Sequence, residues 1–472
     1  MGGNVFDKIY VDGEFVTPHG TELGDLFNPA TGKVIGQVQL ADEVDAELAI
    51  AAAKRALPSW SVTSREERID ALQRLQAAVA AIRNEILEAA QLEYGAPLPR
   101  NEWMADMAVN AFSDMITTLK DFDFTHKVGK ATVEMVPVGV AGLITPWNCD
   151  AFFICNKLAT AMAAGCTVVI KPSEMSATQT DVVTRALHEA GLPKGVFNIV
   201  TGLGHVVGTA ISRHADVAAI SFTGSTAVGK LIVREAAETL KRVSLELGGK
   251  SPSIILDDAD LDKAVAGALQ AGFVNSGQAC TAGTRILVPA SLLDEVLAIA
   301  TAKMADFPTG DPRDAATAIG PMVSERQWER VQSYIRRGVE EGARVVAGGP
   351  DRPDGLSDGY FVRPTLFADV TNDMTIAREE IFGPVLSVIT YRDDDDAVEI
   401  ANDTTYGLQA YVHSSDPTRA RHIASRLEAG RVLINGAQES LSPFGGFKQS
   451  GLGREYGTYG LESFLELRAV TQ

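Results

Sequence analysis

Short apolar runs alternate with longer helical stretches through this 472-residue chain, and no other feature constrains the fold as much. The runs of the first series are residues 138–144, 166–170, 197–200, 218–222 and 243–247. Such alternation is typical of parallel strands joined by crossover helices, which form a doubly wound sheet. The sequence therefore predicts an α/β lobe in the first half of the chain.

The same pattern restarts after residue 250 and predicts a second α/β lobe. Its apolar runs are residues 253–256, 286–288, 344–346, 386–391, 409–413 and 432–434. The chain length also suits more than one domain, at roughly 150 residues each. A run of four acidic residues, 393–396, lies where a helix is expected to begin and where negative charge suits the helix dipole.

The region before the first lobe has helical spacing at residues 43–57, 65–94 and 101–122. We expect a helical beginning, interrupted around Gly95, Pro97 and Pro99. Polar and apolar residues alternate over 132–138, which predicts a ribbon that serves assembly rather than the core.

Composition excludes several classes of protein. With 46% hydrophobic and 22% charged residues the chain can bury a core, and its net charge of −19 disfavours nucleic acid as a partner. Charges interrupt the start of the chain where a signal peptide would be apolar, and residues 158–170 are too few to cross a membrane. Four cysteines without a CxxC pair argue against a disulfide framework and structural zinc, so we expect no metal. A cytoplasmic protein without membrane partners is predicted.

Two glycine-rich segments follow strands of the first lobe and are candidates to hold phosphate. Residues 202–207 place Val207 where a dinucleotide fingerprint has its third glycine. Residues 224–230 match a nucleotide-triphosphate loop until Leu231 replaces the residue that would hold magnesium. A helix amino terminus opened by glycine still offers N–H groups to a pyrophosphate, although a tight turn alone would explain the same residues.

Three polar positions are candidates for chemistry. Cys280 lies in a small-residue loop where backbone N–H groups could stabilise a thiolate, the alternative being an inert buried cysteine. Glu246 lies between two leucines at a strand end, where burial would raise its pKa toward that of a general base, unless it faces solvent. Residues 171–174 close the second strand at the edge where such sheets bind ligands, or are surface charges.

Seven motifs, in order, resemble those of the aldehyde dehydrogenase superfamily over nearly the whole chain. The motifs lie at residues 146–148 (PWN), 171–174 (KPSE), 222–225 (FTGS), 246–250 (ELGGK), 277–280 (GQAC), 379–384 (EEIFGP) and 443–448 (PFGGFK). The resemblance implies a Rossmann-like cofactor-binding lobe, a second α/β catalytic lobe and a small β-ribbon for oligomerisation. The implied bounds are 1–122 with 138–248 for the NAD-binding domain, 249–442 for the catalytic domain, and 123–137 with 443–472 for the oligomerisation ribbon and carboxyl-terminal segment.

The resemblance also implies an NAD-dependent oxidation of an aldehyde to the acid. Cys280 would attack the aldehyde carbon, with the oxyanion held by the Asn148 amide and the Cys280 backbone N–H. Glu246 would activate water to hydrolyse the thioester, or deprotonate the thiol earlier. A homodimer or homotetramer is implied, in which the 132–137 ribbon joins the 464–471 segment.

Cofactor and substrate residues follow from the same match. The residues implied for the cofactor are Trp147, Lys171, Ser173, Glu174, Gly224, Ser225, Gly229, Glu380 and Phe382. Since Glu174 would repel a 2′-phosphate, NAD is expected to be preferred and NADP to bind more weakly. The residues expected along the aldehyde channel are Cys149, Phe152, Phe153, Asn156 and Phe444. Residues 104–115, expected beside that channel, hold no Arg or Lys, which favours an uncharged aliphatic or aromatic aldehyde.

Some residues depart from common family patterns, and other functions compete. Cys149 and Asp150 follow Asn148 where relatives often have an aromatic residue and proline, and residues 435–444 form a shorter segment than in many relatives. A phosphate-loop nucleotidase is the best alternative from the residues alone, with Leu231 against it. A non-catalytic member is a further alternative, which the intact Cys280, Glu246 and Asn148 disfavour. A coenzyme A-acylating enzyme is another, and Glu246 counts against it because it supplies the base for hydrolysis.

Overall fold

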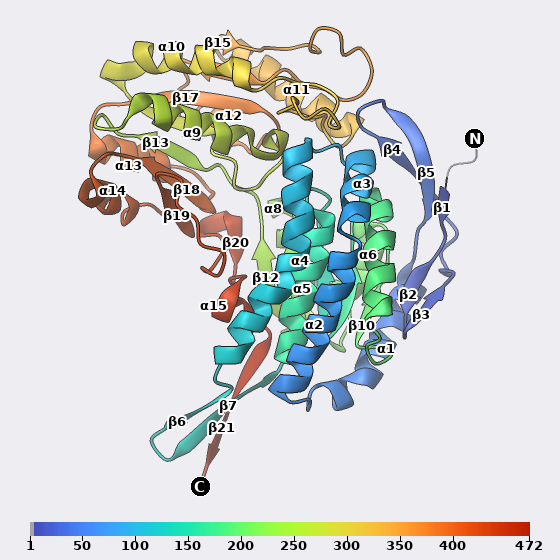
Figure 1. Ribbon diagram of the computed structural model, residues 1–472. Coiled ribbons are helices and arrows are strands. Elements are labelled where there is room, and N and C mark those ends of the chain that lie inside the picture. The colour runs from blue at the N-terminus through green and yellow to red at the C-terminus, as the bar shows by residue number, and fades with distance from the viewer. Residues whose placement is uncertain (1–3) are drawn as a thin grey trace.

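The computed structural model describes residues 4–472, so the first three residues of the expected cofactor domain lie outside the described residues. An eight-stranded sheet organises the first lobe, in the order β20-β12-β11-β8-β9-β10-β2-β3 (Figure 1). Its parallel strands are β8 (Val140–Ile144), β9 (Thr167–Lys171), β10 (Phe197–Ile199), β11 (Val217–Thr223) and β12 (Arg242–Glu246). Antiparallel strands complete its two edges: β2 (Ile9–Val11), β3 (Glu14–Val16) and β20 (Gly451–Leu452). The predicted doubly wound sheet is confirmed.

The register of this sheet brings four loops to one edge. Ile144 is paired with both Lys171 and Phe222, and Thr223 with Glu246, so β8, β9, β11 and β12 end level with one another. Chain order reverses between β8 and β11, and this topological switch point is where open α/β sheets bind ligands.

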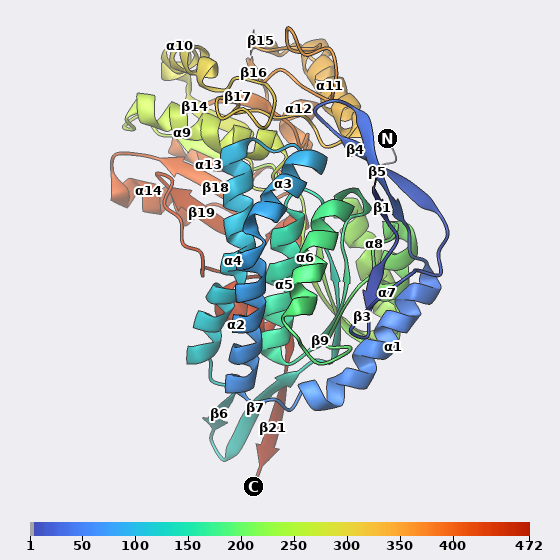
Figure 2. The same ribbon diagram turned by 45° about the vertical axis from the view of Figure 1, so that its right-hand side comes forward.

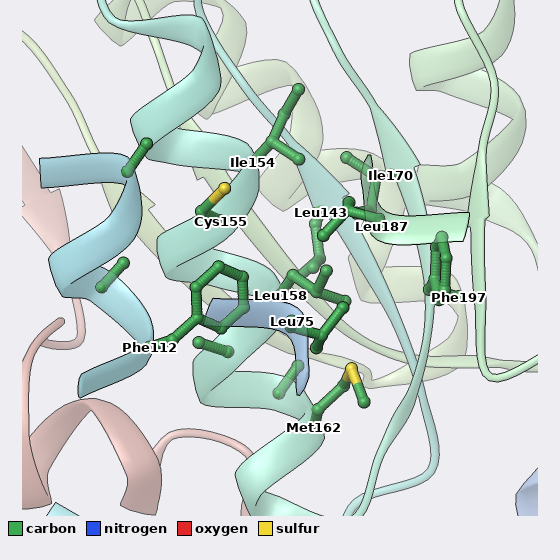
Figure 3. Close-up of a cluster of buried hydrophobic side chains, with 14 of the residues drawn as sticks. Leu75, Phe112, Leu143, Ile154, Cys155, Leu158, Met162, Ile170, Leu187 and Phe197 are labelled. Carbon is green, nitrogen blue, oxygen red and sulfur yellow. The ribbon is translucent and has the colours of Figure 1, made fainter. Parts of the chain in front are cut away.

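Helices cover both faces of the first sheet (Figure 2). One face carries α2 (Arg65–Ala81), α3 (Arg83–Glu93), α4 (Leu98–Asp121), α5 (Asp150–Ala164) and α6 (Ala177–Glu189), and the other carries α1 (Glu43–Trp60), α7 (Thr209–Arg213) and α8 (Thr226–Ala236). Every residue of α5 is buried, because this helix lies between the sheet and α4. In Figure 3, Leu158 and Met162 of α5 pack among Phe112 of α4 and Leu143 of β8. The position of α5 is therefore fixed by packing on all sides.

The second lobe contains a seven-stranded sheet in the order β15-β16-β17-β14-β13-β18-β19. Its strands are β13 (Pro252–Ile255), β14 (Arg285–Pro289), β15 (Arg344–Ala347), β16 (Thr365–Ala368), β17 (Val385–Tyr391), β18 (Gln409–His413) and β19 (Arg431–Ile434). Its helices are α9 (Leu261–Phe273), α10 (Leu293–Lys303), α11 (Glu325–Glu340), α12 (Thr375–Arg378), α13 (Asp394–Asn402) and α14 (Pro417–Ala424). The acidic run does begin a helix, with Asp393 as the amino-terminal cap of α13. β16 was not predicted, because its four residues form too short an apolar run to stand out in the sequence.

A three-stranded antiparallel ribbon projects from the first lobe (Figure 1). It consists of β6 (Thr125–Val128), β7 (Ala131–Pro137) and the carboxyl-terminal β21 (Leu465–Thr471). β21 pairs with β7 along its whole length, from Leu465 opposite Pro137 to Thr471 opposite Ala131. A short helix, α15 (Gly457–Glu462), leads into β21.

The helical segments expected at 43–57, 65–94 and 101–122 are confirmed as α1, α2 with α3, and α4, but the strands that precede them were not predicted. Before α1 the chain forms β1 (Asn4–Phe6), β2, β3, β4 (Leu23–Asn28) and β5 (Lys33–Gln39). β1, β5 and β4 make a small separate sheet, while β2 and β3 extend the main sheet. These strands are three to seven residues long, too short for their alternation to stand out in the sequence.

Two details of the predicted helices also differ. Residues 65–94 are split between α2 and α3, because Ile82 has φ −106° and ψ 16°, outside the helical region. Pro99 does not interrupt α4 but lies in its first turn, where a missing backbone N–H has no consequence. Among residues 4–472, no helix combines the length and the apolar character needed to cross a membrane.

Candidate active site

A cavity of about 1040 Å³ opens between the two lobes, and both Cys280 and Asn148 line it. Its walls come from α4, α5, the Cys280 loop, the end of β18 and residues 435–444. All five residues predicted for the aldehyde channel line the same cavity: Cys149, Phe152, Phe153, Asn156 and Phe444. The structure thus brings the predicted nucleophile and the predicted channel together.

A strained turn after α9 delivers Cys280 to the cavity. Asn275, Ser276 and Gly277 are all left-handed, with φ of 56°, 56° and 74°. A Cβ on Gly277 would lie 2.2 Å from the carbonyl carbon and oxygen of Gly383, so the turn needs glycine here. Strained backbone of this kind is typical of functional sites, where the surrounding contacts hold it.

The thiol of Cys280 is the most accessible of the four free cysteines, since the other three are buried. Burial raises the pKa of Cys280 to about 12, and the carboxyl groups of Glu380 and Glu246 add to the rise. The thiol is therefore protonated in this state, and a base must take its proton before it can act as a nucleophile.

Asn148 clamps the Cys280 loop to the end of β8. Its Nδ2 donates to the carbonyl oxygen of Gln278 at 2.9 Å, and Asn275 Nδ2 donates to the Asn148 carbonyl oxygen at 3.2 Å. The side chain of Gln278 is itself fixed, as its Oε1 accepts from the Val323 N–H at 2.9 Å. These contacts place an amide donor beside the loop that carries the thiol.

Glu246 ends β12 with both carboxyl oxygens buried, and neither has a hydrogen-bond partner within residues 4–472. Burial raises the pKa of Glu246 well above its usual range, and the nearby Glu455 raises it further. A carboxyl group with a raised pKa is a stronger base than an exposed one once it is ionised, as suits a general base.

Two charged residues near Glu246, Lys157 and Glu455, were not predicted from the sequence. Lys157, in the middle of the buried helix α5, forms an ion pair with Glu455, and its Nζ donates to Ser221 Oγ at 2.8 Å. Each of these two charges lowers the free-energy cost of burying the other. The signal in the sequence that could have identified Lys157 is the presence of a lysine within the apolar segment that forms α5.

The 171–174 loop leaves the carboxyl end of β9 as predicted. Lys171 Nζ donates to the carbonyl oxygen of Pro172 at 2.9 Å and to Glu174 Oε2 at 3.1 Å. Ser173 Oγ accepts from the Met175 N–H and starts a short 3-10 turn. The Glu174 side chain is 34% exposed, which leaves its carboxylate accessible at the sheet edge.

The second glycine segment opens α8 at the same edge. Ser225 is exposed and caps the helix, and the Gly224 N–H donates to the Glu246 carbonyl oxygen at 3.0 Å. Gly229, also predicted for the cofactor, is a close-packing position, since a Cβ there would lie 2.7 Å from the Leu247 side chain. Gly229 therefore permits α8 to pack closely on the sheet.

The first glycine segment is a packing turn. Val207 is fully buried, and a Cβ on Gly202 would lie 2.5 Å from its side chain. Residues 204–208 form a single π-helical turn that leads into α7. The segment is folded against the core and presents no cradle.

Glu380 and Phe382 reach from the second lobe toward the first. Glu380 Oε1 accepts from the Gly249 N–H at 3.0 Å, and burial raises its pKa to about 7. Phe382, left-handed with φ 62°, packs edge-to-face on Trp147 with ring centroids 5.4 Å apart. These contacts place Trp147, Glu380 and Phe382 where the two lobes meet.

Two arginines in the cavity were also missed. Residues 104–115 hold no cation, as the sequence shows, but Arg100 lies one turn earlier on the same face of α4 and lines the cavity, as does Arg431. Arg431 Nε donates to Gln409 Oε1 at 2.9 Å, and its guanidinium lies 5.1 Å from the ring centroid of Phe444. The helical spacing of Arg100, Trp103 and Met107 was the signal that could have found the first of them.

Comparison with known proteins agrees with this geometry. The model of the aldehyde dehydrogenase family matches residues 15–470. A 3-succinoylsemialdehyde-pyridine dehydrogenase from a Pseudomonas species is 46% identical over 468 residues, which cover 98% of each chain. The structure of an aldehyde dehydrogenase from Pseudomonas syringae, a Cys-to-Ala variant in complex with NAD+ and octanal, is 43% identical with a TM-score of 0.97, covering 98% of this chain and 96% of that one. A betaine aldehyde dehydrogenase from Staphylococcus aureus in complex with NAD+ is 36% identical with a TM-score of 0.94, covering 98% and 94%.

Proposed function

The chain belongs to the aldehyde dehydrogenase family, and from this premise we propose that it oxidises an uncharged aldehyde to the carboxylic acid with NAD as the oxidant. One observation carries the proposal: the partly exposed, cavity-lining Cys280 lies with the Asn148 amide beside its loop and with the buried Glu246 carboxyl close enough to perturb its pKa. A nucleophile, an oxyanion donor and a base are the groups that aldehyde oxidation through a thioester requires.

In the first step the sulfur of Cys280 bonds to the aldehyde carbon and forms a hemithioacetal. The thiol proton must leave as the bond forms; Glu246, whose pKa is raised by burial, is a nearby group that can take it, and it must pass that proton to solvent before the second half of the reaction. Asn148 Nδ2 would turn from the Gln278 carbonyl oxygen to the substrate oxyanion, together with the Cys280 N–H.

The nicotinamide cofactor supplies the hydride acceptor when it is bound. The residues proposed to hold it are Lys171, Ser173 and Glu174 at the ribose, Gly224 and Ser225 at the pyrophosphate, and Trp147, Glu380 and Phe382 at the nicotinamide end. The support is chemical: an exposed helix amino terminus, a carboxylate at the sheet edge and a buried carboxyl at the lobe boundary suit phosphate and ribose hydroxyls.

The second half of the reaction removes the acyl group from Cys280. Glu246 takes a proton from water, whose oxygen then bonds to the thioester carbon while the carbon–sulfur bond breaks. The Lys157–Glu455 ion pair lies close enough to Glu246 to influence its pKa: Glu455 raises that pKa and Lys157 lowers it.

The substrate walls favour an apolar aldehyde. Phe152 and Phe153 pack against each other at 5.2 Å between ring centroids, and Phe444 stacks on Tyr456 at 5.4 Å. Cys149 and Asn156 complete the wall contributed by α5. The octanal bound by the Pseudomonas syringae relative is a molecule of this class.

The proposal is tested by aldehyde-dependent reduction of NAD, followed at the absorbance of the reduced cofactor, with the native protein and with Cys280→Ala. We expect the variant to lose turnover entirely and to retain NAD binding, because the thiol lies apart from the sheet edge that would hold the cofactor. Turnover by Cys280→Ala would refute the covalent mechanism. Absence of NAD reduction by the native protein with every one of a panel of alkyl and aryl aldehydes would refute the function.

A further inference from the structure

Arg100 is a guanidinium without an acceptor in the wall of the substrate cavity. It lies in the first turn of α4 and lines the cavity together with Cys280. The side chain is partly exposed; within residues 4–472 its Nε is inaccessible and has no hydrogen-bond partner, and the side chain forms no ion pair. An inaccessible donor without a partner is costly, so a cavity-lining arginine whose Nε is held in this state points to a ligand at its remaining donors.

The orientation of this guanidinium is fixed by Trp103. The Arg100 guanidinium carbon lies 3.8 Å from the Trp103 ring centroid, which is close stacking. Trp103 in turn lies 6.4 Å from the ring of Phe152, one of the aromatic residues of the α5 wall. The N–H donors of a guanidinium lie in its plane and form a rigid fork, and stacking on Trp103 holds that plane in one orientation.

The surroundings of Arg100 hold no compensating carboxylate. The groups close enough to influence its charge are Cys149, Tyr94 and Cys280, all of which are neutral when protonated, and burial lowers its pKa. Arg431, the other arginine of the cavity, differs in this respect because Gln409 accepts its Nε–H. Arg100 is thus the cavity cation whose donors remain available near the reactive thiol.

The charge of the whole cavity lining bears on whether the ligand group that accepts from Arg100 is anionic or neutral. Arg100, Arg431 and Lys263 are matched by three acidic residues, Asp114, Asp260 and Glu439, which gives a formal balance of 3 − 3 = 0. A carboxylate would pair with the Arg100 guanidinium, but it would lose its hydration in a lining that carries no net positive charge. A neutral carbonyl oxygen satisfies the guanidinium at a smaller desolvation cost.

We propose that Arg100 is a specificity-determining residue that binds a second, ketone carbonyl oxygen of the substrate, so that the preferred substrates are oxo-aldehydes. This inference rests on the proposed function and narrows its substrate class. A site with a buried donor rejects an analogue that lacks the acceptor, because the donor is then left unpaired. The simple alkyl aldehyde therefore reacts, but less efficiently.

The test compares hexanal, 4-oxohexanal and 6-oxohexanoate as substrates, which share six carbons and differ in the second oxygen group. The native protein should use 4-oxohexanal at least tenfold more efficiently than either of the others, mainly through a lower KM. In Arg100→Met the ratio of kcat/KM for 4-oxohexanal over hexanal should fall by about 10- to 100-fold, the worth of a hydrogen bond to a charged group. Arg100→Lys, which keeps the charge and loses the planar fork, should give an intermediate ratio.

Arg336→Met is the matched control, because Arg336 is an exposed arginine of α11 away from the cavity, and both rates should stay unchanged. A native preference for hexanal or for 6-oxohexanoate over 4-oxohexanal overturns the inference without any variant. Equal losses on hexanal and 4-oxohexanal in Arg100→Met also overturn it, since they indicate an effect on folding or on the Cys280 thiol. Turnover of hexanal itself reports on the proposed function, so failure of that function is distinguishable from failure of this inference.

Discussion

At the residue scale, Glu246 combines burial with the absence of any hydrogen-bond partner for its carboxyl oxygens within the described chain. In Glu246→Gln the amide cannot accept a proton from water, so we expect the thioester on Cys280 to persist. Intact-mass analysis after mixing with aldehyde and NAD should show the acylated chain. Glu238→Gln, an exposed change on the same lobe, is the control and should show no adduct. A variant that forms no adduct because acylation has stopped would assign Glu246 to the thiol instead.

The raised pKa of Glu246 also determines whether hydrolysis of the acyl-enzyme becomes faster or slower as the pH rises. Since burial raises that pKa, the carboxyl remains protonated to a higher pH than an exposed glutamic acid, and only its ionised form is a base. Hydrolysis of the acyl-enzyme should therefore accelerate as pH rises through the elevated pKa. Glu246→Gln should lose this dependence.

Glu174 governs the choice of cofactor in the proposed site. Its partly exposed carboxylate would repel a 2′-phosphate, while Lys171 offsets part of the repulsion. We expect NAD to exceed NADP in kcat/KM, and Glu174→Gln to narrow the gap by roughly fivefold, which corresponds to about 1 kcal/mol for one screened charge. Initial rates with both cofactors measure this, with the exposed Glu189→Gln as the control. Equal efficiency in the native protein would mean that Glu174 does not face the ribose.

At the scale of elements, the left-handed turn between α9 and Cys280 fixes the position of the proposed nucleophile. Gly277→Ala adds a Cβ to a residue at φ 74° and against the Gly383 carbonyl group. We expect the free energy of unfolding to fall by about 1–3 kcal/mol or more and kcat to fall with it, because Cys280 moves with the turn.

Gly355→Ala is a matched control for this prediction. Gly355 has φ 78°, close to that of Gly277, but nothing lies within 4 Å of the Cβ that alanine would add. Thermal unfolding and initial rates of the two variants separate the cost of a left-handed alanine from the cost of the close approach. Equal effects in both would show that the contact with Gly383 has no importance.

At the scale of the whole molecule, the ribbon leaves apolar side chains exposed in a single chain. Leu467 is 66% exposed on β21, the outermost strand of its sheet, and an unpaired strand edge is a site for pairing with another chain. We propose that this edge lies in the interface of a homodimer or homotetramer. Leu467→Lys should then dissociate the assembly, as measured by light scattering after gel filtration. Val62→Lys, at an 80% exposed position in the turn after α1, should leave the mass unchanged. A monomeric native protein would contradict the proposal.

The two α/β lobes and the chemical groups of the candidate site could be predicted from the sequence alone. The apolar runs are long enough to show parallel strands, and motifs that follow strand ends share one sheet edge in any doubly wound fold. Cys280 and Glu246 were candidates because a polar residue amid small or apolar ones is unusual, whereas Asn148 followed only from the resemblance to the aldehyde dehydrogenase superfamily. The short amino-terminal strands and β16 were missed, because three to seven residues carry too little periodicity.

Tertiary structure decided what surrounds those groups. The approach of Glu455 to Glu246 and the docking of Glu380 against Gly249 join residues more than 100 positions apart, and no local pattern encodes such contacts. Arg100 illustrates the difference: its place on the cavity face of α4 follows from helical spacing, whereas its lack of an acceptor depends on every element packed around it. Local periodicity is written in neighbouring residues, but burial and charge are properties of the assembled chain.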